Sequence, residues 1–524
     1  MSHETEATTQ QAAAVRAAPM EMSAEEFRRL GHGLIDRIAE WLERMPAGKV
    51  TPGEDPATVR AALGGGDLPL DGGPAGQVLD DAARLLFEHS LFNGHPRFFG
   101  FITSSAAPIG ALGDLLAAAV NPNLGGFPLS PMATEIELPT VRWIAQLLGY
   151  PDDCGGLLVS GGNVANFVGF WAARRARADW DLRRLGNGAG GRVARFYASR
   201  ETHTWIQKAA DLSGFGTDAV RWIDTDARQR MRVDALAAAI DEDLAAGHQP
   251  MIVVGTAGSV STGAVDPLRE IAALCRERGL WLHVDGAYGA PAAALSEADP
   301  DLKALALADS VAVDPHKWLY APLEAGCTLV RDRSLLRETF AYHPPYYPDV
   351  EEVVDPPVFF HEYGPQNSRG FRALKVWLAL RQVGRRGCEA SIREDIALAR
   401  RLYERCAEHH ELEAATCELS IATFRFVPRD LGPRTAEREV AAYLDQLNET
   451  LMERLMAGGE AFVSNAVIEG RFLLRACVVN FRTTTADVDA LPEIVAVAGR
   501  ALDGELRPAE LAGGAPRNSP GSVT

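Results

Sequence analysis

Short β-rich runs alternate with stretches of helical periodicity between residues 76 and about 340, and this alternation constrains the fold most. A parallel connection between two strands needs a crossover of a dozen or more residues, usually a helix. The pattern therefore predicts an α/β fold whose sheet is mostly parallel and covered by helices on both faces. The predicted strands are Leu157–Val159, Ala194–Ala198, Met251–Gly255, Trp281–Val284 and Ser310–Val313.

The clearest strand–helix–strand unit lies between the third and fourth of these runs. Asp266 precedes Pro267, which predicts a helix with Asp266 as N-cap and proline at the first helical position. Apolar residues then recur at helical spacing, and Gly279 is placed to end the helix. This unit supports a parallel sheet.

The segments before and after this region differ in character. Ser23 and Glu26 form an S-x-x-E pattern, which predicts a helix start. The apolar stripe that follows fits packing on the chain's own core or on a second subunit. Residues 47–75 are rich in Gly, Pro and Asp and predict a loop. Residues 340–368 predict a second, long loop, a feature that is usually functional.

A smaller α+β domain is predicted at the C-terminal end. A long helix runs from about Phe371 to Arg401, and two strand-like and two helical runs follow it: Ser420–Phe426, Phe472–Phe481, 436–456 and 486–502. The predicted division of the chain is a disordered tail over 1–22, a helical arm over 23–95, a large domain over 96–400, a small domain over 401–504 and a tail over 505–524.

Charge and cysteine content narrow the function classes. The 524-residue chain carries a net charge of −18, which disfavours nucleic acid and anionic membranes as partners and favours a small-molecule substrate. The seven cysteines form no C-x-x-C pair, which argues against a disulfide framework and a cysteine metal site. Without a secretory apolar segment or an apolar run of spanning length, we expect a cytoplasmic protein.

Four short motifs lie at predicted carboxyl ends of strands, where open α/β sheets bind ligands. In the first, Ser160-Gly161-Gly162-Asn163 connects a strand to a helix. Glycines at such a turn let backbone N–H groups approach an anion, so Gly161, Gly162 and Asn163 predict a phosphate cradle. No Gly-Lys-Ser/Thr follows, which excludes a Walker loop. Taken alone, the motif fits an ordinary glycine turn equally well.

The next two motifs place a carboxylate and a histidine near this cradle. Asp285 follows an apolar strand, and a buried carboxylate is costly unless it is paired. A pyridinium N–H is such a partner, and a protonated ring is the electron sink that pyridoxal phosphate (PLP) chemistry needs. Ala287 is small enough to pack under a flat ring, and His203 is placed to stack on its other face. A structural cap, a buried ion pair or a structural histidine are the alternatives.

The fourth motif, Asp314-Pro315-His316-Lys317, follows the run Ser310–Val313. A lysine at a strand end forms a Schiff base with a carbonyl cofactor when its surroundings favour the neutral amine. His316 contributes to those surroundings and is placed to contact a phosphate. A surface lysine is the alternative, but the apolar residues after Lys317 argue against exposure. Together the four motifs predict PLP on Lys317.

With these motifs, the chain resembles the PLP-dependent group II amino-acid decarboxylases, which include aromatic-L-amino-acid, histidine and glutamate decarboxylases. The resemblance runs from about Met22 to Leu502. It implies a type I PLP-dependent, aspartate aminotransferase-like fold and an obligate homodimer with active sites at the interface. Further matching segments are His95-Pro-Arg-Phe98-Phe99, Ser130-Pro-Met-Ala-Thr134-Glu135 and Phe371-Arg372-Ala-Leu-Lys375.

The resemblance implies a role for each motif. Lys317 would carry PLP as a Schiff base, Asp285 would pair with the pyridine nitrogen, and His203 would stack on the ring. Asp314 stands where many members have Asn near the phosphate. An ionised carboxylate there repels a phosphate, so either a neighbouring donor binds Asp314 or Asp314 is displaced. The residues around the phosphate would be Gly161, Gly162, Asn163 and His316.

The resemblance also implies the reaction, decarboxylation of an L-amino acid to the amine and CO2. A tyrosine of the long loop would protonate the substrate carbon, and Tyr346 is favoured over Tyr347, although either fits a lid contact. Phe98, Phe101 and Phe127 are predicted to line the substrate pocket, which favours an aromatic amino acid. Plain core positions are the alternative for these side chains.

Four other functions fit the same motifs. A glutamate decarboxylase would need a cation for the distal carboxylate. An aldehyde synthase shares the fold, but its members tend to carry Phe at the loop tyrosine. An aminotransferase would use Arg475 or Arg482 to clamp a carboxylate. A non-catalytic binding protein of PLP fold is disfavoured by intact Lys317, Asp285 and His203.

Overall fold

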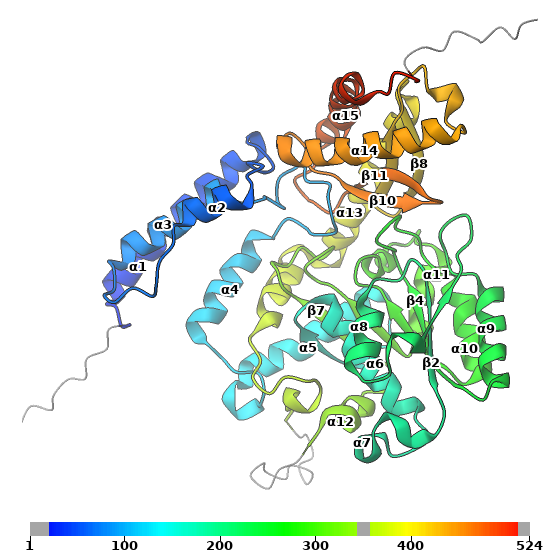
Figure 1. Ribbon diagram of the computed structural model, residues 1–524. Coiled ribbons are helices and arrows are strands. Elements are labelled where there is room, and N and C mark those ends of the chain that lie inside the picture. Colours follow the sequence, from blue (N-terminus) through cyan, green and yellow to red (C-terminus); the bar gives the residue numbers. More distant parts are fainter. Residues whose placement is uncertain (1–19, 343–356, 512–524) are drawn as a thin grey trace, which may run out of the picture. The chain divides into compact units, whose positions relative to one another are not determined.

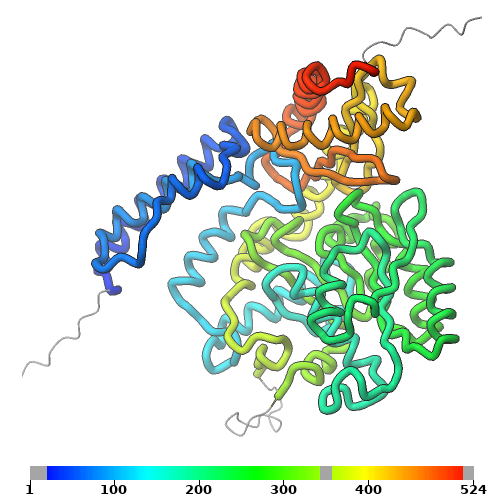
Figure 2. Tube along the Cα trace, in the orientation of Figure 1, coloured from blue at the N-terminus to red at the C-terminus, as the bar shows by residue number. Residues whose placement is uncertain are grey.

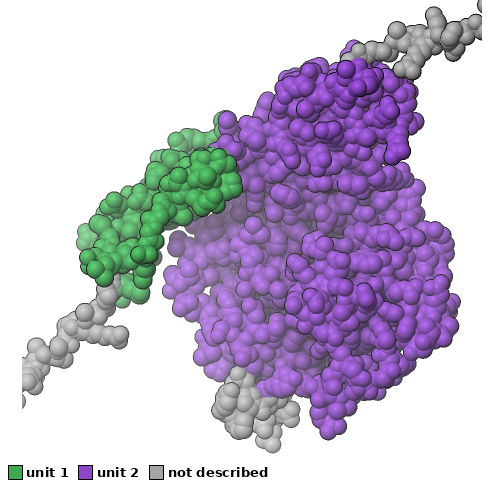
Figure 3. All heavy atoms as spheres, viewed as in Figure 1, with its two compact units in different colours: residues 1–48, 54–90 green, residues 49–53, 91–524 purple. Residues whose placement is uncertain are grey.

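The computed structural model describes residues 20–342 and 357–511. Contacts divide the chain into two units, one with residues up to 48 and 54–90, the other with 49–53 and the residues from 91 onward (Figure 3). Tyr346 and Tyr347 lie outside the described residues, as do most of the two predicted tails. None of the described helices is long and apolar enough to cross a membrane. The domain boundaries given above stay predictions.

The first unit is helical. It holds α1 (Ala24–Arg44), α2 (Pro56–Leu63) and α3 (Ala75–Glu88), with a short 3-10 turn after α1. The predicted helix start is confirmed, because Ser23 Oγ accepts the Glu26 N–H at 3.1 Å. The prediction of a loop over 47–75 is wrong at α2. Asp55 caps that helix by accepting two backbone N–H groups, so a local cap outweighs the Gly- and Pro-rich composition.

The second unit contains a seven-stranded sheet with the order β1-β7-β6-β5-β4-β2-β3. Strands β3 to β6 and β2 run parallel, and only β7 is antiparallel to its neighbours β1 and β6. The mostly parallel sheet is therefore confirmed, while β3 and β7 were not predicted. The strands are β1 (Gly155–Val159), β2 (Ala194–Ser199), β3 (Val220–Ile223), β4 (Gln249–Thr256), β5 (Trp281–Asp285), β6 (Ser310–Val313) and β7 (Gly326–Val330).

Helices cover both faces of this sheet (Figure 1). Side chains alternate along β4, so Val253 packs in the core with α9 and α10, whereas Ile252 and Val254 pack in the core with α6 and α8. Both faces are thus apolar, as a parallel sheet requires. The covering helices are α6 (Gly161–Arg177), α8 (Trp205–Leu212), α9 (Val233–Ala245) and α10 (Leu268–Arg278).

The predicted capping of α10 by Asp266 is wrong. Gly279 ends the helix at φ 68° as expected, but the residue at the N-cap position is Pro267. The Asp266 carboxylate instead accepts the backbone N–H groups of Met231 and Thr256 at 2.7 and 2.8 Å. Desolvation is the main reason that the pKa of this buried carboxyl rises to about 6. Two donors from distant segments therefore bind the side chain, which local spacing could not predict.

A four-stranded antiparallel sheet forms the C-terminal part, with the order β10-β11-β9-β8. Two helices, α14 and α15, pack with this sheet in a core of their own (Figure 1). The predicted smaller α+β domain is confirmed in class, although β8 and β10 were not predicted. The elements are β8 (Leu412–Glu418), β9 (Ile421–Phe426), α14 (Arg438–Gly458), β10 (Ser464–Ile468), β11 (Arg471–Cys477) and α15 (Thr485–Leu506).

The helix α13 (Arg372–Glu408) contacts elements of both sheets. It extends beyond the predicted end at Arg401 and is interrupted at Gly384, where φ is 64°. Two helices from much earlier in the chain, α4 (Pro108–Val120) and α5 (Pro131–Leu148), lie beside it (Figure 2). Trp143 of α5 stacks on Trp377 with ring centroids 6.5 Å apart. α13 thus contacts segments from both the early and the late parts of the chain.

Candidate functional site

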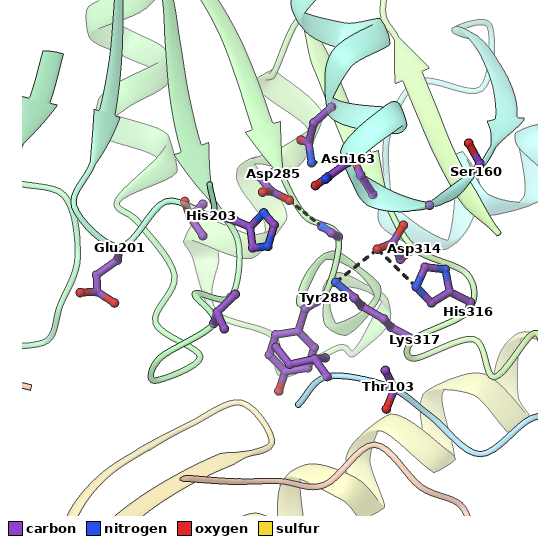
Figure 4. A pocket seen from close by; sticks show the side chains of 18 residues that line it. Thr103, Ser160, Asn163, Glu201, His203, Asp285, Tyr288, Asp314, His316 and Lys317 are labelled. Atoms are coloured by element: carbon purple, nitrogen blue, oxygen red, sulfur yellow. Dashed lines mark hydrogen bonds and ion pairs between the residues drawn. The ribbon is translucent and has the colours of Figure 1, made fainter. Parts of the chain in front are cut away.

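A cavity of about 410 Å³ lies at the carboxyl edge of the large sheet. The segments that follow β1, β2, β4, β5 and β6 all contribute to its wall, because these strands end at the same edge. Figure 4 shows the side chains that line it. All residues predicted to hold a cofactor are among them: Gly161, Gly162, Asn163, His203, Asp285, Ala287, Asp314, His316 and Lys317.

Lys317 reaches this cavity from the turn after β6. Its side chain is 19% exposed, and its Nζ lies 3.2 Å from Asp314 Oδ2 (Figure 4). The turn is held on both sides, since Lys317 N–H donates to the Asp314 carbonyl and Ser104 Oγ donates to the His316 carbonyl at 2.8 Å. Trp318, the next residue, is fully buried. A lysine in such a turn is positioned rather than free on the surface.

Asp314 lies close to two basic side chains. Its Oδ2 lies 3.6 Å from His316 Nε2 as well as near Lys317, and its Oδ1 is buried without a hydrogen-bond partner. A Cβ atom at Gly162 would lie 2.6 Å from Asp314 Oδ2, and Gly161 has φ 78°. The cradle therefore needs glycine at both positions, one for space and one for backbone conformation. An anion bound at these backbone N–H groups would lie near Asp314, and the negative charge of Asp314 is balanced by Lys317.

Asp285 stands at the end of β5 and is 7% exposed. Its Oδ2 accepts the Trp205 indole N–H at 2.8 Å, and its Oδ1 accepts the Ala287 backbone N–H at 3.2 Å. Both donors are neutral, so they orient the carboxylate without balancing its charge. A protonated pyridine nitrogen in the cavity fits this carboxylate, because it would supply both the N–H and the positive charge.

His203 lies on the cavity wall near Asp285 (Figure 4). Desolvation is the main cause that lowers the pKa of its imidazole, and Asp285 acts in the opposite direction. The neutral form is therefore favoured, which suits a ring that stacks on a protonated pyridine without adding charge. Lys317, Asp285 and His203 thus meet in one cavity with a glycine cradle, and this residue set fits PLP.

A buried polar chain supports the cradle from behind. The Asn166 side chain donates to the Gly162 carbonyl at 2.9 Å, and Asn166 Oδ1 lies 2.8 Å from His283 Nε2. His283 Nδ1 lies 2.7 Å from Ser310 Oγ. Burial lowers the pKa of His283 to about 4, so the imidazole stays neutral at physiological pH. The chain ties the cradle to β5 two residues before Asp285.

Several lining residues escaped prediction, among them Thr103, Glu201, Val260 and Tyr288. Thr103 follows the predicted Phe98 segment closely, so extending that motif would have found it. Val260 comes from the loop after β4, which carries no chemical motif. Tyr288 reaches the small sheet, where its hydroxyl lies 2.6 Å from Ser420 Oγ.

The aromatic residues predicted for the substrate pocket do not line the cavity of their own chain. Phe98 is buried and stacks on Phe462 with ring centroids 5.3 Å apart. Phe101 is 51% exposed, and Phe127 is half-buried in a 3-10 turn. Sequence spacing placed them near the site, but the direction of each side chain depends on packing with distant residues such as Phe462.

The two arginines considered as carboxylate clamps are engaged elsewhere. Arg475 is buried, donates to the Val260 carbonyl, and donates through Nε to Ser464 Oγ at 3.0 Å. The Arg482 guanidinium lies over the Phe481 ring, 4.6 Å from its centroid. Neither arginine lines the cavity. Arg475 instead fixes the loop that carries Val260.

Asp395 of α13 anchors the residues after Lys317. Its Oδ2 accepts the Trp318 indole N–H at 2.8 Å and the Tyr320 hydroxyl at 2.5 Å. Desolvation is the largest influence on its pKa and raises it to about 7, although the hydrogen bonds act in the opposite direction. At a pH between these two values, the folded protein therefore keeps a proton on Asp395. The unfolded chain, in which the carboxyl has its ordinary pKa of 3.8, has lost that proton.

We expect the contribution of Asp395 to stability to fall with rising pH. It is fully present below about pH 4 and is lost through about pH 7, with a slope of at most about 1.4 kcal/mol per pH unit. Urea unfolding of the protein and of Asp395→Asn, which cannot titrate, measures this between pH 4.5 and 8. The difference between their free energies of unfolding should decline and level off above about pH 7. A difference that stays constant would contradict the prediction.

Comparisons with known proteins agree with this geometry. Residues 62–427 match the pyridoxal-dependent decarboxylase conserved domain. An aromatic-L-amino-acid decarboxylase of Bacillus atrophaeus is 33% identical over 90% of this chain and 94% of its own. A phenylacetaldehyde synthase of a Rosa hybrid cultivar is 28% identical over 87% and 90% of the two chains. The crystal structure of Oryza sativa TDC with PLP and tryptamine has a TM-score of 0.84 at 28% identity and covers 92% and 99%.

Proposed function

The chain belongs to the pyridoxal-dependent decarboxylase family, and on this premise we propose that it converts an aromatic L-amino acid into the amine and CO2. It is a PLP-dependent carboxy-lyase with a type I PLP-dependent fold. The observation that carries the proposal is the meeting of Lys317, Asp285 and His203 around one cavity. The similarity to an aromatic-L-amino-acid decarboxylase supports the class of substrate.

Bound PLP supplies an electron sink for the carbon that loses CO2. We assign Lys317 Nζ to its covalent attachment, Asp285 to the ring nitrogen and His203 to the ring face. Asp285 would hold the proton on the ring nitrogen, because its two neutral donors leave its negative charge unbalanced. Ala287 would pack against the ring. The backbone N–H groups at the start of α6 would bind the phosphate, with His316 and Asp314 beside it.

The walls of the cavity suit an apolar substrate. Val260 and Ile102 contribute aliphatic surface, and Tyr288 an aromatic ring. In the part of the chain that the structure describes, no arginine lines the cavity, so no guanidinium is in place for a distal carboxylate. Poor solvation of a substrate carboxylate against these apolar side chains would favour its loss as neutral CO2.

A panel of amino acids with CO2 release as readout tests the proposed function. We expect tryptophan, tyrosine, DOPA or phenylalanine to be decarboxylated at least ten times faster than glutamate, since an unpaired distal carboxylate costs more than 1.4 kcal/mol in an apolar wall. A matched control is the amine that decarboxylation of phenylalanine would give. It has the same side chain but no carboxylate, so it has no CO2 to release. Glutamate turnover equal to that of the aromatic substrates would overturn the choice of substrate.

Tyr346 is the proposed donor of the proton that replaces CO2 on the substrate carbon, with Tyr347 as the alternative. We expect Tyr346→Phe to shift the product from amine to aldehyde, with oxygen consumed and ammonia released, because the carbon is no longer protonated. An oxygen electrode with amine and aldehyde quantification measures the shift. Tyr347→Phe is the matched control and should keep the amine as the main product. The reverse assignment follows if only Tyr347→Phe makes aldehyde.

We propose that the protein is a homodimer with Phe101 and Phe127 reaching the site across the subunit interface. One face of α4 packs on α13, and the other exposes four large aliphatic side chains: Leu112, Leu115, Leu116 and Val120. An apolar helix face of this kind is typical of a subunit interface. Neither Phe101 nor Phe127 lines the cavity of its own chain. Sedimentation of the protein and of Leu116→Glu measures the association.

We propose a reducing, cytoplasmic location. All seven cysteines are free thiols, and five of them are buried. Burial raises the pKa of Cys275 to about 12 and that of Cys477 to about 11, so these thiols resist oxidation. A chain with free thiols only suits a compartment where disulfides do not form.

A further inference from the structure

The indole of Trp205 is the residue that fixes the Asp285 carboxylate. Trp205 is fully buried at the start of α8, and its Nε1–H donates to Asp285 Oδ2 at 2.8 Å. Asp285 Oδ1 is held by the backbone of Ala287 at 3.2 Å. Each carboxylate oxygen thus has one donor from the protein, and neither donor carries a charge.

One short segment serves the cofactor site in two ways. His203 lies on the cavity wall, and Trp205, two residues later, lies behind Asp285. The segment enters from β2, whereas Asp285 ends β5, so the indole bond joins the carboxyl ends of two strands. A displacement of this segment would therefore move the stacking imidazole and the carboxylate partner together.

The indole ring is itself held in place. It packs against the His283 ring in a T-shaped arrangement, with centroids 5.3 Å apart and planes at 78°. His283 is buried and bonded to both Ser310 and Asn166. Asn166 in turn donates to the Gly162 carbonyl of the cradle. The Trp205 N–H therefore lies in a buried layer whose neighbouring side chains are hydrogen-bonded to one another.

A proton between a carboxylate and a pyridine nitrogen is bound either to the carboxylate oxygen or to the nitrogen. In an apolar site the neutral pair of carboxylic acid and pyridine competes with the ion pair of carboxylate and pyridinium, because burial disfavours charge. A hydrogen bond donated to the carboxylate favours its ionised form. Loss of that donor would favour the neutral pair, in which the carboxylate holds the proton in place of the ring nitrogen.

From these contacts we propose that Trp205 is a positioning residue for the reaction, whose indole N–H keeps Asp285 ionised and thereby keeps the cofactor ring nitrogen protonated. This inference rests on the proposed role of Asp285. It assigns the strength of the electron sink to a residue that does not line the cavity. Trp205 acts on the ring nitrogen through Asp285, so its effect on the protonation of that nitrogen must vanish when Asp285 is replaced by a residue that cannot ionise.

The test uses Trp205→Phe, which keeps an aromatic ring in the slot and removes the N–H. Holoenzyme is reconstituted with PLP labelled with 15N in the ring, and the 15N chemical shift reports protonation of the nitrogen. We expect the wild-type nitrogen to be protonated and the variant nitrogen to be largely deprotonated at the same pH. Because Trp205→Phe loses a hydrogen bond to a charged group, we expect its kcat to fall roughly 10- to 100-fold.

The matched control is Trp281→Phe. Trp281 is also buried and donates its indole N–H at 2.8 Å, but to the neutral Ser310 hydroxyl. We expect its 15N shift to equal that of the wild type. A second arm places Trp205→Phe in the Asp285→Asn background, where it should have no further effect on the shift. Equal shifts for the two tryptophan variants, or additive effects with Asp285→Asn, overturn the inference.

Two outcomes separate this inference from the proposed function. Wild-type protein that binds no PLP, or binds it with an unprotonated nitrogen, contradicts the role of Asp285 itself. A protonated nitrogen in both wild type and Trp205→Phe leaves the decarboxylase intact and overturns only the role of Trp205. Should Trp205→Phe not fold, Trp205→Met fills the slot with a flexible side chain without a donor and is held to the same criterion.

Discussion

Lys317→Ala abolishes covalent attachment of PLP and lowers decarboxylation by roughly 10⁴-fold or more, because no other amine replaces the nucleophile that holds the cofactor. Lys317 is the lysine that lines the cavity, with its Nζ 3.2 Å from Asp314. Borohydride reduction followed by peptide mass spectrometry measures the attachment. The wild type should carry the reduced cofactor on the peptide with Lys317, and the variant should carry none.

A second lysine gives a closely matched control. Lys375 is also buried, and its Nζ also lies 3.2 Å from an aspartate, Asp114. It sits on α13 and does not line the cavity. Lys375→Met should therefore retain the reduced adduct and the absorbance of the bound cofactor. An adduct on Lys375, or a Lys317→Ala variant that keeps its visible absorbance, would refute the assignment.

Asp285→Asn is expected to lower kcat by roughly 10²- to 10³-fold, because truncating the charge of a buried pair costs several kcal/mol. The amide keeps the shape of the carboxylate but cannot hold a proton on the ring nitrogen. It also presents an N–H where Trp205 or Ala287 already donates. Single-turnover CO2 release measures the chemical step, and equilibrium dialysis measures the affinity for PLP.

The control for this variant is Asp309→Asn. Asp309 is a partly buried acid that accepts the Leu282 backbone N–H at 2.8 Å near the amino end of β5, whereas the cavity lies at its carboxyl end. Desolvation is the main reason that its pKa is raised, so the amide replaces an acid that is also partly removed from solvent. We expect Asp309→Asn to affect unfolding but not the single-turnover rate. If the two variants lost the same rate, the ring nitrogen would not depend on Asp285.

The sequence predicted those parts of the site that are local. Gly161, Asp285 and Lys317 each lie in the segment that follows a predicted strand, and parallel strands bring their carboxyl ends to one edge. Their meeting in one cavity therefore follows from topology and residue chemistry alone. The four motifs together predicted PLP, and the resemblance to the family then implied the reaction; the match over residues 62–427 supports both.

The contacts that hold these residues could not be predicted, because their partners are distant in the chain. Trp205 and Asp285 are 80 residues apart, and Arg475 and the Val260 carbonyl are 215 apart. A single sequence gives no measure of which buried donor meets which acceptor. The same reason explains why Asp266 was wrongly predicted as a helix cap. Its carboxylate accepts the backbone N–H groups of Met231 and Thr256 and does not cap the adjacent helix.

The ties between the two sheets have a consequence for biosynthesis. The large sheet is complete once Val330 has been made, yet three residues that fix its cavity come later in the chain. Asp395 holds Trp318, Ser420 meets Tyr288, and Arg475 binds the Val260 loop. A ribosome-bound chain that ends before β11 therefore has its cofactor lysine but lacks its final support. We therefore expect cofactor capture to follow translation of the C-terminal sheet.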